Sequence, residues 1–564
     1  YPFCWRCQSP LIYFAKNSWF LKTTAVKNQM ISENKKIGWH PEFIRDGRFG
    51  EWLSENVDWA ISRERYWGTP LPIWQCAKCA NQKVIGSLAK LDEFAPERSA
   101  RIFIMRHGQA DHNVKGIIGP ATPERDYDNH LTKKGIAEVK KAAAGLKKEK
   151  IDLVISSPLN RARQTAEILS KNLGAKTEIN NNIYDIDAGD FHGRSVREEH
   201  KEFPFERKLR EPFPNGESLR DTRSRMMMEL RRIAKNNRGK NIVIVSHGDP
   251  LWMLNAALEG LPEKDYKTSW YPKTGEAKEL ELHNWPYNRA GELDLHRPYI
   301  DLIDLACAKC GGKMKRVKEV ADVWFDSGCV PFAQDHYPFD KKIALQYPAD
   351  YIAEGIDQTR GWFYTLLAVS SLLKLPAPYK NVLVLGLVLD EKGEKMSKSR
   401  GNAAEPLPLF EKYGADAVRW YFYTVNQPWD EKLFKESDIA EASRRFMNIF
   451  WNSFVYWRTY KDKGSVLKKK PKLLINKWLD IRLNQVGYDA TEALEKFDIV
   501  RAARMIENFV AEDLSRWYVR RSRRRFQRPK NQAELAGVST VLSEVLTNLA
   551  KIMASFTPFV SEII

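Results

Sequence analysis

Four cysteines stand in two identical tetrapeptides, Cys76-Ala77-Lys78-Cys79 and Cys307-Ala308-Lys309-Cys310. Paired CxxC sequences are typical of structural zinc sites, in which four thiolates surround the metal as a tetrahedron. The pairs lie much farther apart than in a compact zinc ribbon, so we predict one Zn²⁺ site whose halves flank an insertion. The two ends of that insertion must then lie close together. A further pair, Cys4 and Cys7, has no second pair in view, and zinc binding by it stays open.

A second group of reactive residues lies between the two cysteine pairs. Three short apolar segments, 101–105, 151–155 and 241–245, lead into Arg106-His107-Gly108, into a segment holding Arg161, and into Ser246-His247-Gly248. Such runs predict buried parallel strands, whose carboxyl ends share one edge of a sheet. Histidine and arginine gathered at that edge predict a cationic pocket for a dianionic phosphoryl group.

These segments, with Asn113 and the tripeptide Gly216-Glu217-Ser218, resemble the histidine phosphatase (phosphoglycerate mutase-like) superfamily over about residues 100–285. The resemblance implies that His107 is the nucleophile and forms a phosphohistidine. It also implies that four residues hold the phosphoryl oxygens: Arg106, Arg161, His247 and, in an assisting role, Asn113.

The general acid that protonates the leaving oxygen is less certain from the sequence. Asp185 stands where many relatives carry Glu, and Asp187 and Glu217 are the alternatives. The phosphorylated substrate is not readable from the sequence. An inactive structural insert is the alternative to an active phosphatase.

Outside the insertion, a Gly-flanked loop carries Lys395-Met396-Ser397-Lys398-Ser399. Its lysines could reach a triphosphate and compensate charge on a leaving pyrophosphate. The loop follows an apolar run, 381–389, which predicts one buried parallel strand. Residues 347–358 predict a strand ending in a polar loop, 361–373 a helix, and 322–328 an acidic and aromatic turn. This α/β pattern predicts ligand binding beyond the carboxyl ends of the strands.

The same loop, together with GTPLPIW (68–74), DVWFDSG (322–328) and AEGIDQTRGWF (353–363), resembles the class I aminoacyl-tRNA synthetases, and among them the isoleucyl enzymes. The resemblance covers about 1–95 and 290–564. It implies activation of isoleucine by ATP with Mg²⁺, transfer to tRNA(Ile), and catalytic roles for Lys395 and Lys398. It further implies an ATP and adenylate site formed by Glu354, Gly355, Asp357, Gln358, Lys395, Met396, Ser397, Lys398 and Ser399. The family's HIGH signature and editing site belong upstream of Tyr1, so this segment alone is not expected to aminoacylate.

The C-terminal part, after about residue 437, has a helical pattern and resembles the family's anticodon-binding domain. A cluster of arginines among aromatic residues predicts its RNA face, through phosphate contact and base stacking: Arg520, Arg521, Arg523, Arg524 and Arg525. A solvated helix surface is the alternative. The formal net charge of +18 fits a polyanionic partner, or solubility alone.

We therefore expect an α/β protein: a Rossmann-type class I synthetase core with zinc-binding CxxC elements, an inserted α/β histidine phosphatase domain, and an all-α anticodon-binding domain. The expected boundaries are 1–98, 99–286, 287–436 and 437–564. No run of about 20 apolar residues predicts a membrane span, Cys329 is expected to be a buried core thiol, and paired cysteines fit a reducing, cytoplasmic compartment. We expect a monomer. The competing hypotheses are a phosphohydrolase on synthetase-derived flanks and a non-catalytic RNA-binding protein.

Overall fold

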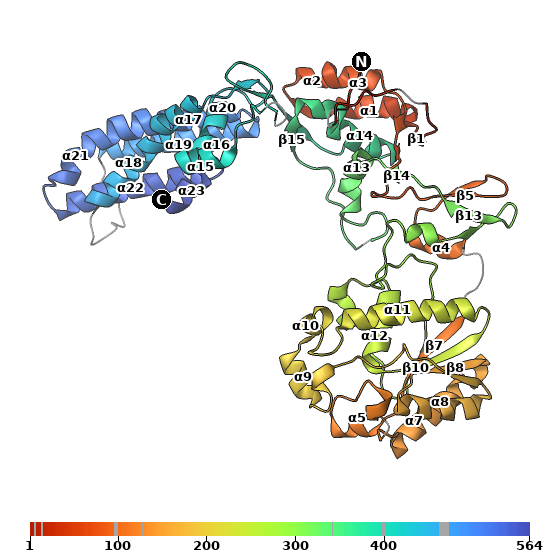
Figure 1. Ribbon diagram of the computed structural model, residues 1–564. Coiled ribbons are helices and arrows are strands. Elements are labelled where there is room, and N and C mark those ends of the chain that lie inside the picture. The colour runs from red at the N-terminus through yellow and green to blue at the C-terminus, as the bar shows by residue number, and fades with distance from the viewer. Residues whose placement is uncertain are drawn as a thin grey trace. The chain divides into compact units, whose positions relative to one another are not determined.

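The computed structural model describes residues 1–4, 7–12, 15–94, 100–126, 128–340, 342–397, 401–461 and 473–564. It forms two compact units, one of residues 1–61 and 324–564 and the other of residues 62–323 (Figure 1). The second unit holds both Cys-Ala-Lys-Cys pairs and the described residues between them. The first unit holds the expected nucleotide-binding segments and the helical C-terminal part.

A five-stranded sheet forms the centre of the second unit, in the order β11-β7-β10-β8-β9. Its four parallel strands are β7 (Arg101–Arg106), β8 (Leu153–Ser156), β9 (Lys176–Ile179) and β10 (Asn241–Ser246), and β11 (Ala277–Glu279) is antiparallel at the edge. The three strands predicted from the apolar runs are present. Ser246 pairs with Arg106, and Val245 pairs with Ser156, so the motifs emerge level with one another at one edge.

Helices cover both faces of this sheet, which is why its central strands are apolar along their whole length. Alternate residues of β7 enter different cores: Ile102 and Ile104 pack with α11 (Leu219–Asn236) and α12 (Gly248–Leu258). Phe103 and Met105 pack with α7 (Lys133–Leu146) and α8 (Asn160–Leu173). Both α7 and α11 begin at hydroxyl N-caps, Thr132 and Ser218, which accept hydrogen bonds from the first turn.

The cysteine pairs lie on a four-stranded antiparallel sheet, β12-β13-β5-β6, made of β5 (Ile73–Cys76), β6 (Gln82–Val84), β12 (Leu305–Ala306) and β13 (Lys313–Arg316). Helix α4 (Leu88–Glu93) lies beside the segment that returns from the insertion. The Asp92 carboxylate accepts hydrogen bonds from His283 Nδ1 at 2.8 Å and from the Asn284 backbone at 2.5 Å. The two ends of the insertion therefore lie side by side, as the split cysteine site requires.

A three-stranded parallel sheet, β15-β16-β2, organises the N-terminal part of the first unit. It consists of β2 (Gly38–His40), β15 (Ile352–Gly355) and β16 (Asn381–Leu385), and the predicted helix is α14 (Trp362–Leu372). The prediction of one strand over 381–389 is wrong. The strand ends at Leu385, and β17 (Val388–Leu389) pairs instead with β18 (Lys432–Leu433). A Cβ on Gly386 would lie 2.3 Å from the Asp430 carbonyl oxygen, so close backbone approach sets the break.

The predicted turn over 322–328 is also wrong, because helix α13 (Val323–Ala333) covers all but its first residue. The prediction relied on the Asp and Ser residues of this segment, because these residue types favour turns where tertiary packing does not stabilise another conformation. Here Gly328 packs directly on the backbone of α14, where a Cβ would lie 2.8 Å from the Thr365 carbonyl oxygen.

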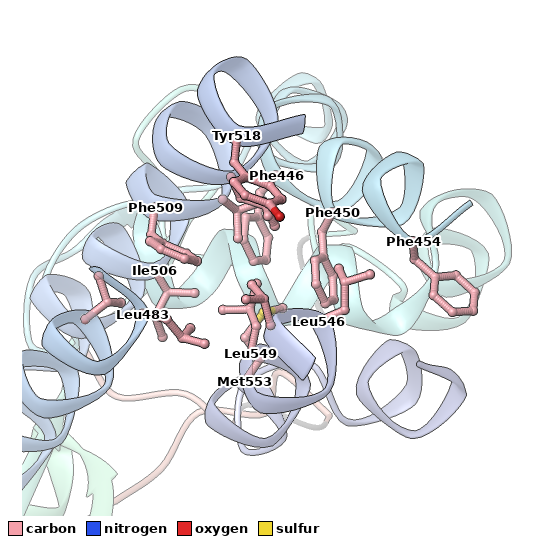
Figure 2. Packing of buried hydrophobic residues seen from close by; sticks show 14 of the residues in the cluster. Phe446, Phe450, Phe454, Leu483, Ile506, Phe509, Tyr518, Leu546, Leu549 and Met553 are labelled. Carbon is pink, nitrogen blue, oxygen red and sulfur yellow. The ribbon is translucent and has the colours of Figure 1, made fainter. Parts of the chain in front are cut away.

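The C-terminal part of the first unit is helical (Figure 1), and the helical pattern predicted after about residue 437 is present. Its helices are α15 (Pro406–Tyr413), α16 (Ala415–Thr424), α17 (Glu436–Ala442), α18 (Asn448–Tyr460), α19 (Leu474–Glu495), α20 (Ile499–Asn508), α21 (Arg520–Gln527), α22 (Gln532–Met553) and α23 (Pro558–Ile563). Figure 2 shows their aromatic core, in which Phe446, Phe450 and Phe509 are fully buried. Among the described helices, α22 alone is long and apolar enough to cross a membrane, and 61% of its apolar window is buried.

Candidate functional sites

The four cysteines of the split pairs meet in one cluster, with all sulfur atoms within 4.8 Å of one another. Cys76 and Cys310 Sγ are 3.6 Å apart, and Cys79 and Cys307 Sγ are 3.7 Å apart. A zinc–sulfur bond of about 2.3 Å gives a tetrahedral edge of about 3.8 Å. The sulfur separations therefore match the edge of a zinc tetrahedron.

Both halves of this cluster have the same backbone geometry. The Ala80 N–H donates to the Cys76 carbonyl at 3.0 Å, and the Gly311 N–H donates to the Cys307 carbonyl at 2.8 Å. The two residues that donate these bonds have positive φ, 55° at Ala80 and 67° at Gly311. Burial opposes ionisation of Cys307, but backbone N–H groups of Lys309 and Cys310 lower its pKa to about 6. Backbone N–H groups of the first turn likewise lower the pKa of Cys76, whereas the neighbouring cysteines raise the pKa of Cys310 to about 12. The turns thus favour the thiolate, the form that binds zinc, at Cys76 and Cys307.

The isolated pair, Cys4 and Cys7, has the same turn. The Gln8 N–H donates to the Cys4 carbonyl at 2.8 Å, Gln8 has φ of 56°, and the Cys4 N–H donates to the Ser9 carbonyl. Hydrogen bonds with Ser9 lower the pKa of the Cys7 thiol to about 7. In the described part of the chain, this pair has no further cysteine or histidine gathered beside it. Cys329 is only half-buried, and its burial raises its pKa to about 11.

The insertion brings the predicted phosphate-binding residues together at the carboxyl edge of its sheet. The buried Arg161 side chain, on the first turn of α8, donates from Nε to His107 Nε2 at 3.3 Å. His107 Nδ1 lies 2.8 Å from the Gly108 carbonyl oxygen, which assigns the ring proton to Nδ1. The Nε2 atom therefore carries the lone pair that can attack phosphorus. Burial, with Arg161 and Arg106 nearby, holds the pKa of His107 well below its usual value, so the ring is neutral.

Two buried donors at this edge have no hydrogen-bond partner among the described residues: Arg106 Nε and His247 Nδ1. His247 Nε2 is occupied by the Ser157 hydroxyl at 2.8 Å. Its Nδ1 lies 3.6 Å from the Asp185 carboxylate, too far for a hydrogen bond. Buried polar groups are rarely left unpaired, so these two atoms indicate a site for an acceptor such as a phosphoryl oxygen.

Of the three candidate acids, Asp185 lies beside this group. Its Oδ2 accepts from Arg161 Nη2 at 2.9 Å, and burial raises its pKa despite that arginine. Glu217 instead forms an ion pair with Arg225 at 2.8 Å. Asp187 lies 2.9 Å from His192 Nε2. The geometry therefore favours Asp185, as a carboxyl group that keeps its proton to higher pH than usual.

Asn113, in α5 (Asp111–Lys115), is linked to the nucleophile through His112. Its amide contacts His112 Nε2 at 2.9 Å and the Ala110 N–H at 3.0 Å, and the His112 ring lies 5.6 Å from that of His107. One important residue was missed: Asp126, which is fully buried and forms an ion pair with Arg161. Asp126 ends the short helix α6 (Pro123–Asp126). A lone aspartate in a segment rich in Pro, Asp and Glu carries no sequence signal for this role.

Two glycines of the motifs are required by close packing. A Cβ on Gly108 would lie 2.6 Å from the Gly135 carbonyl oxygen, on α7. A Cβ on Gly248 would lie 2.5 Å from the Tyr271 hydroxyl and 3.2 Å from Arg106 Cζ. The glycine after each histidine therefore lets a neighbouring element approach the pocket.

In the first unit, the expected adenylate segment lies at the carboxyl end of β15. Glu354 and Asp357 are exposed there, and Gln358 bridges Asp357 and the Trp362 N–H that starts α14. A Cβ on Gly355 would lie 2.8 Å from the Asp357 carboxylate, so Gly355 keeps this edge open. The two carboxylates face solvent, where an ammonium group and ribose hydroxyls have access.

The lysine and serine loop starts after β17 and is held by Asp390. Its carboxylate accepts from the Lys392 and Glu394 backbone and from Asn402 Nδ2 at 2.9 Å. These bonds hold the pKa of Asp390 below its usual range. Lys395 is exposed, whereas Met396 and Ser397 are half-buried. Lys398 and Ser399 lie outside the described residues.

Models of known protein families match nearly the whole chain. The model "tRNA synthetases class I (I, L, M and V)" matches residues 8–115 and 270–433, and "Anticodon-binding domain of tRNA ligase" matches 476–564. The model "Histidine phosphatase superfamily (branch 1)" matches residues 102–284. The chain therefore carries a class I tRNA synthetase domain and an anticodon-binding domain of a tRNA ligase. It carries a histidine phosphatase superfamily domain as an insert.

The similar proteins include the isoleucine–tRNA ligase of Dehalococcoides mccartyi strain 195, 34% identical over 572 residues, covering 100% of this chain and 38% of that protein. The isoleucine–tRNA ligase of Thermus thermophilus is 31% identical, covering 100% of this chain and 36% of that protein. The chain thus spans less than half the length of these relatives. A crystal structure of the alpha-ribazole phosphatase from Shigella flexneri aligns with TM-score 0.29 and 25% identity, over 32% of this chain and 91% of that chain.

The synthetase and phosphatase family models overlap at both junctions, and the strand pairing separates them. Residues 102–115 and 270–284 match both models. Strand β7 and strand β11 are paired within the sheet of the insert, Met105 with Ala277. Both overlapping strands therefore belong structurally to the phosphatase insert.

In the anticodon-binding domain, the five arginines do not form one surface. Arg520, Arg521 and Arg523 are exposed, and Arg521 covers the Trp517 ring at 5.2 Å. Arg524 is exposed as well and forms an ion pair with Glu534 at 2.7 Å. Arg525 is buried and donates to Asn476 at 3.2 Å, so its inclusion in an exposed RNA face is corrected. The helical period turns it inward, which a run of arginines does not reveal.

Proposed function

We propose that the protein to which this chain belongs is an isoleucine–tRNA ligase. It activates isoleucine with ATP and Mg²⁺ and transfers the adenylate's isoleucyl group to tRNA(Ile), as a monomer in the cytoplasm. The observation that carries this proposal is the alignment of the whole chain, at 34% identity, with a protein of that name. The open carboxyl edge of β15 and the exposed Lys395 support it.

Within this reaction, Lys395 and Lys398 compensate charge that develops on the pyrophosphate as it leaves the α-phosphorus. Glu354, Gly355, Asp357 and Gln358 hold the ammonium group and ribose of the adenylate. Met396, Ser397 and Ser399 shape the loop around the triphosphate. The arginines of α21 that are exposed contact tRNA phosphates.

Isoleucine-dependent exchange of pyrophosphate into ATP by the full-length protein tests this proposal. Lys395→Ala should lower the exchange rate by roughly 10²-fold, because it removes transition-state charge compensation. Exchange that depends equally on valine and isoleucine, or that is insensitive to the substitution, would contradict the assignment.

We also propose that Cys76, Cys79, Cys307 and Cys310 bind one structural Zn²⁺. The carrying observation is the sulfur separation of 3.4 to 3.7 Å, which fits a tetrahedral ion. The ion would join the two halves of the synthetase sequence across the insert. Cys4 and Cys7, with the same turn geometry, form half of a second zinc site that needs two further ligands.

We propose that the insert is a phosphohydrolase that acts through a phosphohistidine. The carrying observation is the pair of buried donors, Arg106 Nε and His247 Nδ1, that lack a partner among the described residues and lie beside a neutral His107. Arg161 adds a fixed positive charge, and Asn113 supports the pocket through His112. A pocket of this composition suits the three oxygens of a phosphoryl group.

In the first step, the His107 Nε2 electron pair bonds to phosphorus while the ester P–O bond breaks. The leaving oxygen keeps the electron pair of the broken P–O bond and takes a proton from Asp185. In the second step, water loses a proton to Asp185 and attacks phosphorus. The P–N bond breaks, its electrons return to Nε2, and inorganic phosphate leaves.

Turnover of 4-nitrophenyl phosphate tests this mechanism, with acid-labile ³²P-labelling of the protein as a second measurement. His107→Ala should abolish both, and His107→Gln is the matched control for packing. Turnover that survives in the His107→Ala variant overturns the phosphohistidine.

A further inference from the structure

Beside the phosphate site of the insert lies a row of aromatic rings that the two chemical steps do not use. Tyr271 lies next to Arg106, whose Cζ is 5.8 Å from the ring centroid. Trp252, on α12, contacts the Tyr271 ring at 5.5 Å in an edge-on arrangement. Phe205, which starts α10 (Phe205–Arg210), lies 5.4 Å from the Trp252 ring. We call these three rings the aromatic ledge.

The ledge is held rigidly and is accessible at its inner end. The Tyr271 hydroxyl donates to Asp249 Oδ1 at 3.1 Å, and the Trp252 Nε1–H donates to the Tyr266 carbonyl at 2.9 Å. Tyr271 is nevertheless 47% exposed, because only its hydroxyl end is enclosed by Asp249 and Gly248. Burial and Asp249 raise the pKa of Tyr271, so the hydroxyl remains a donor. An exposed, immobilised ring beside a phosphate site is suited to stacking.

The two lysines beside the ledge are already paired. Lys208 forms ion pairs with Asp249 at 2.7 Å and Glu199 at 3.2 Å. Lys267, which lies over the Phe205 ring at 4.8 Å, is paired with Glu206 at 2.6 Å. A second anionic group on the substrate would therefore have to compete with a carboxylate for either lysine. The ledge favours an uncharged leaving group.

We propose that the substrate of the insert is a phosphomonoester whose leaving group carries an uncharged aromatic ring, stacked on the aromatic ledge at Tyr271 or Trp252. This inference rests on the proposed phosphatase activity and specifies its substrate class. Two sources share this chemistry. An aryl phosphate places its ring directly on Tyr271, whereas a nucleoside 5′-monophosphate reaches outward, past its ribose, to Trp252.

The test compares kcat/KM for phenyl phosphate, AMP and glycerol 3-phosphate in the full protein and its variants. Tyr271→Leu should lower kcat/KM for the aromatic substrate about tenfold more than for glycerol 3-phosphate, since base stacking on an aromatic side chain has that order of magnitude. Tyr271→Phe, which keeps the ring and loses the Asp249 bond, should preserve the selectivity. Dividing each substrate's kcat/KM in a variant by its value in the wild type cancels the different leaving-group reactivities.

A loss confined to phenyl phosphate in Tyr271→Leu identifies an aryl phosphate, and a matching loss for AMP in Trp252→Leu identifies a nucleotide. An equal loss for all three substrates in Tyr271→Leu overturns the inference, because Tyr271 would then act only by positioning Arg106. Binding of phenylphosphonate and methylphosphonate, measured by calorimetry, needs no turnover. Absence of any His107-dependent turnover would defeat the phosphatase proposal, whereas equal binding of the two phosphonates would defeat the aromatic ledge.

Discussion

The phosphate site proposed for the insert and the nucleotide-binding edge proposed for the synthetase core are built in opposite ways. In the insert, His107, Arg161 and His247 are buried, and other side chains hold each of them. In the core, Glu354, Asp357 and Lys395 are exposed, and the described part of the lysine loop is held by Asp390 and Asn402. The first arrangement keeps histidine neutral by excluding water, and the second leaves room for large substrates.

This difference shows how burial of a site changes the loss of activity expected from a single substitution. A small dianion is recognised by a few prearranged donors, so a single substitution removes most of the activity. In the proposed synthetase function, ATP and tRNA contact many exposed groups, so each group contributes less. Five substitutions test this contrast, in order of decreasing expected effect.

Cys307→Ser should remove the zinc site altogether, because a structural tetrahedral site requires all four ligands. Bound zinc, measured by atomic absorption, should fall by one ion per chain, and thermal stability should fall with it, since metal binding energy is folding energy. Cys329→Ser is the matched control and should leave the zinc content unchanged. Unchanged zinc content in Cys307→Ser contradicts the site.

His107→Ala should lower phosphatase turnover by at least about 10³-fold, because it removes the nucleophile. Isoleucine-dependent pyrophosphate exchange should be unchanged, measured on the same preparation. Parallel loss of both activities would show that the substitution disrupts folding and would erase the contrast between the sites.

Asp185→Asn should lower kcat by about 10²- to 10⁴-fold and change the pH profile. Because the pKa of Asp185 is raised, the protonated acid persists to higher pH than usual, and wild-type turnover falls as pH rises through that pKa. The variant should lose this alkaline limb. Because the pKa of His107 is lowered, the acid limb lies below pH 6.5 in both proteins. An alkaline limb that persists in Asp185→Asn assigns it to another group.

Asp126→Asn should lower the stability of the insert by about 3–5 kcal/mol, since it leaves the Arg161 charge buried with one partner fewer. Thermal unfolding measures this effect. The KM for a phosphomonoester should change as well, because Arg161 is the side chain whose position Asp126 sets. A stable variant with unaltered KM would remove Asp126 from the site.

Arg523→Ala should weaken tRNA binding by about 1 kcal/mol and reduce the slope of log K against log salt by about one. Arg525→Ala should instead lower stability, because that side chain is buried against Asn476. Filter binding at several salt concentrations separates the two. Equal tRNA losses in both variants would contradict the division of the arginines by burial.

Sequence patterns predicted much of the fold and the site, and they failed where packing outweighs local preference. The three strands of the insert were predicted because their apolar runs indicate buried strands. The His and Arg residues that follow the runs indicate where each strand ends. The helix α13 was missed because the Asp and Ser residues of 322–328 favour turns, while contact of Gly328 with α14 stabilises the helix. Asp126 and Ser157 were missed because their roles depend on Arg161 and His247, which are far away in the sequence.

The sequence by itself determined which chemistries we propose for this protein: four cysteines for a metal, histidine and arginine for a phosphoryl group, and lysines for a triphosphate. Residue types determine these chemistries, because only certain side chains can supply each ligand or charge. Tertiary structure alone decided which acid stands beside Arg161, which arginines are exposed, and that an aromatic ledge adjoins the phosphate site. These outcomes depend on distances and burial between residues far apart in the chain, and no local pattern encodes them.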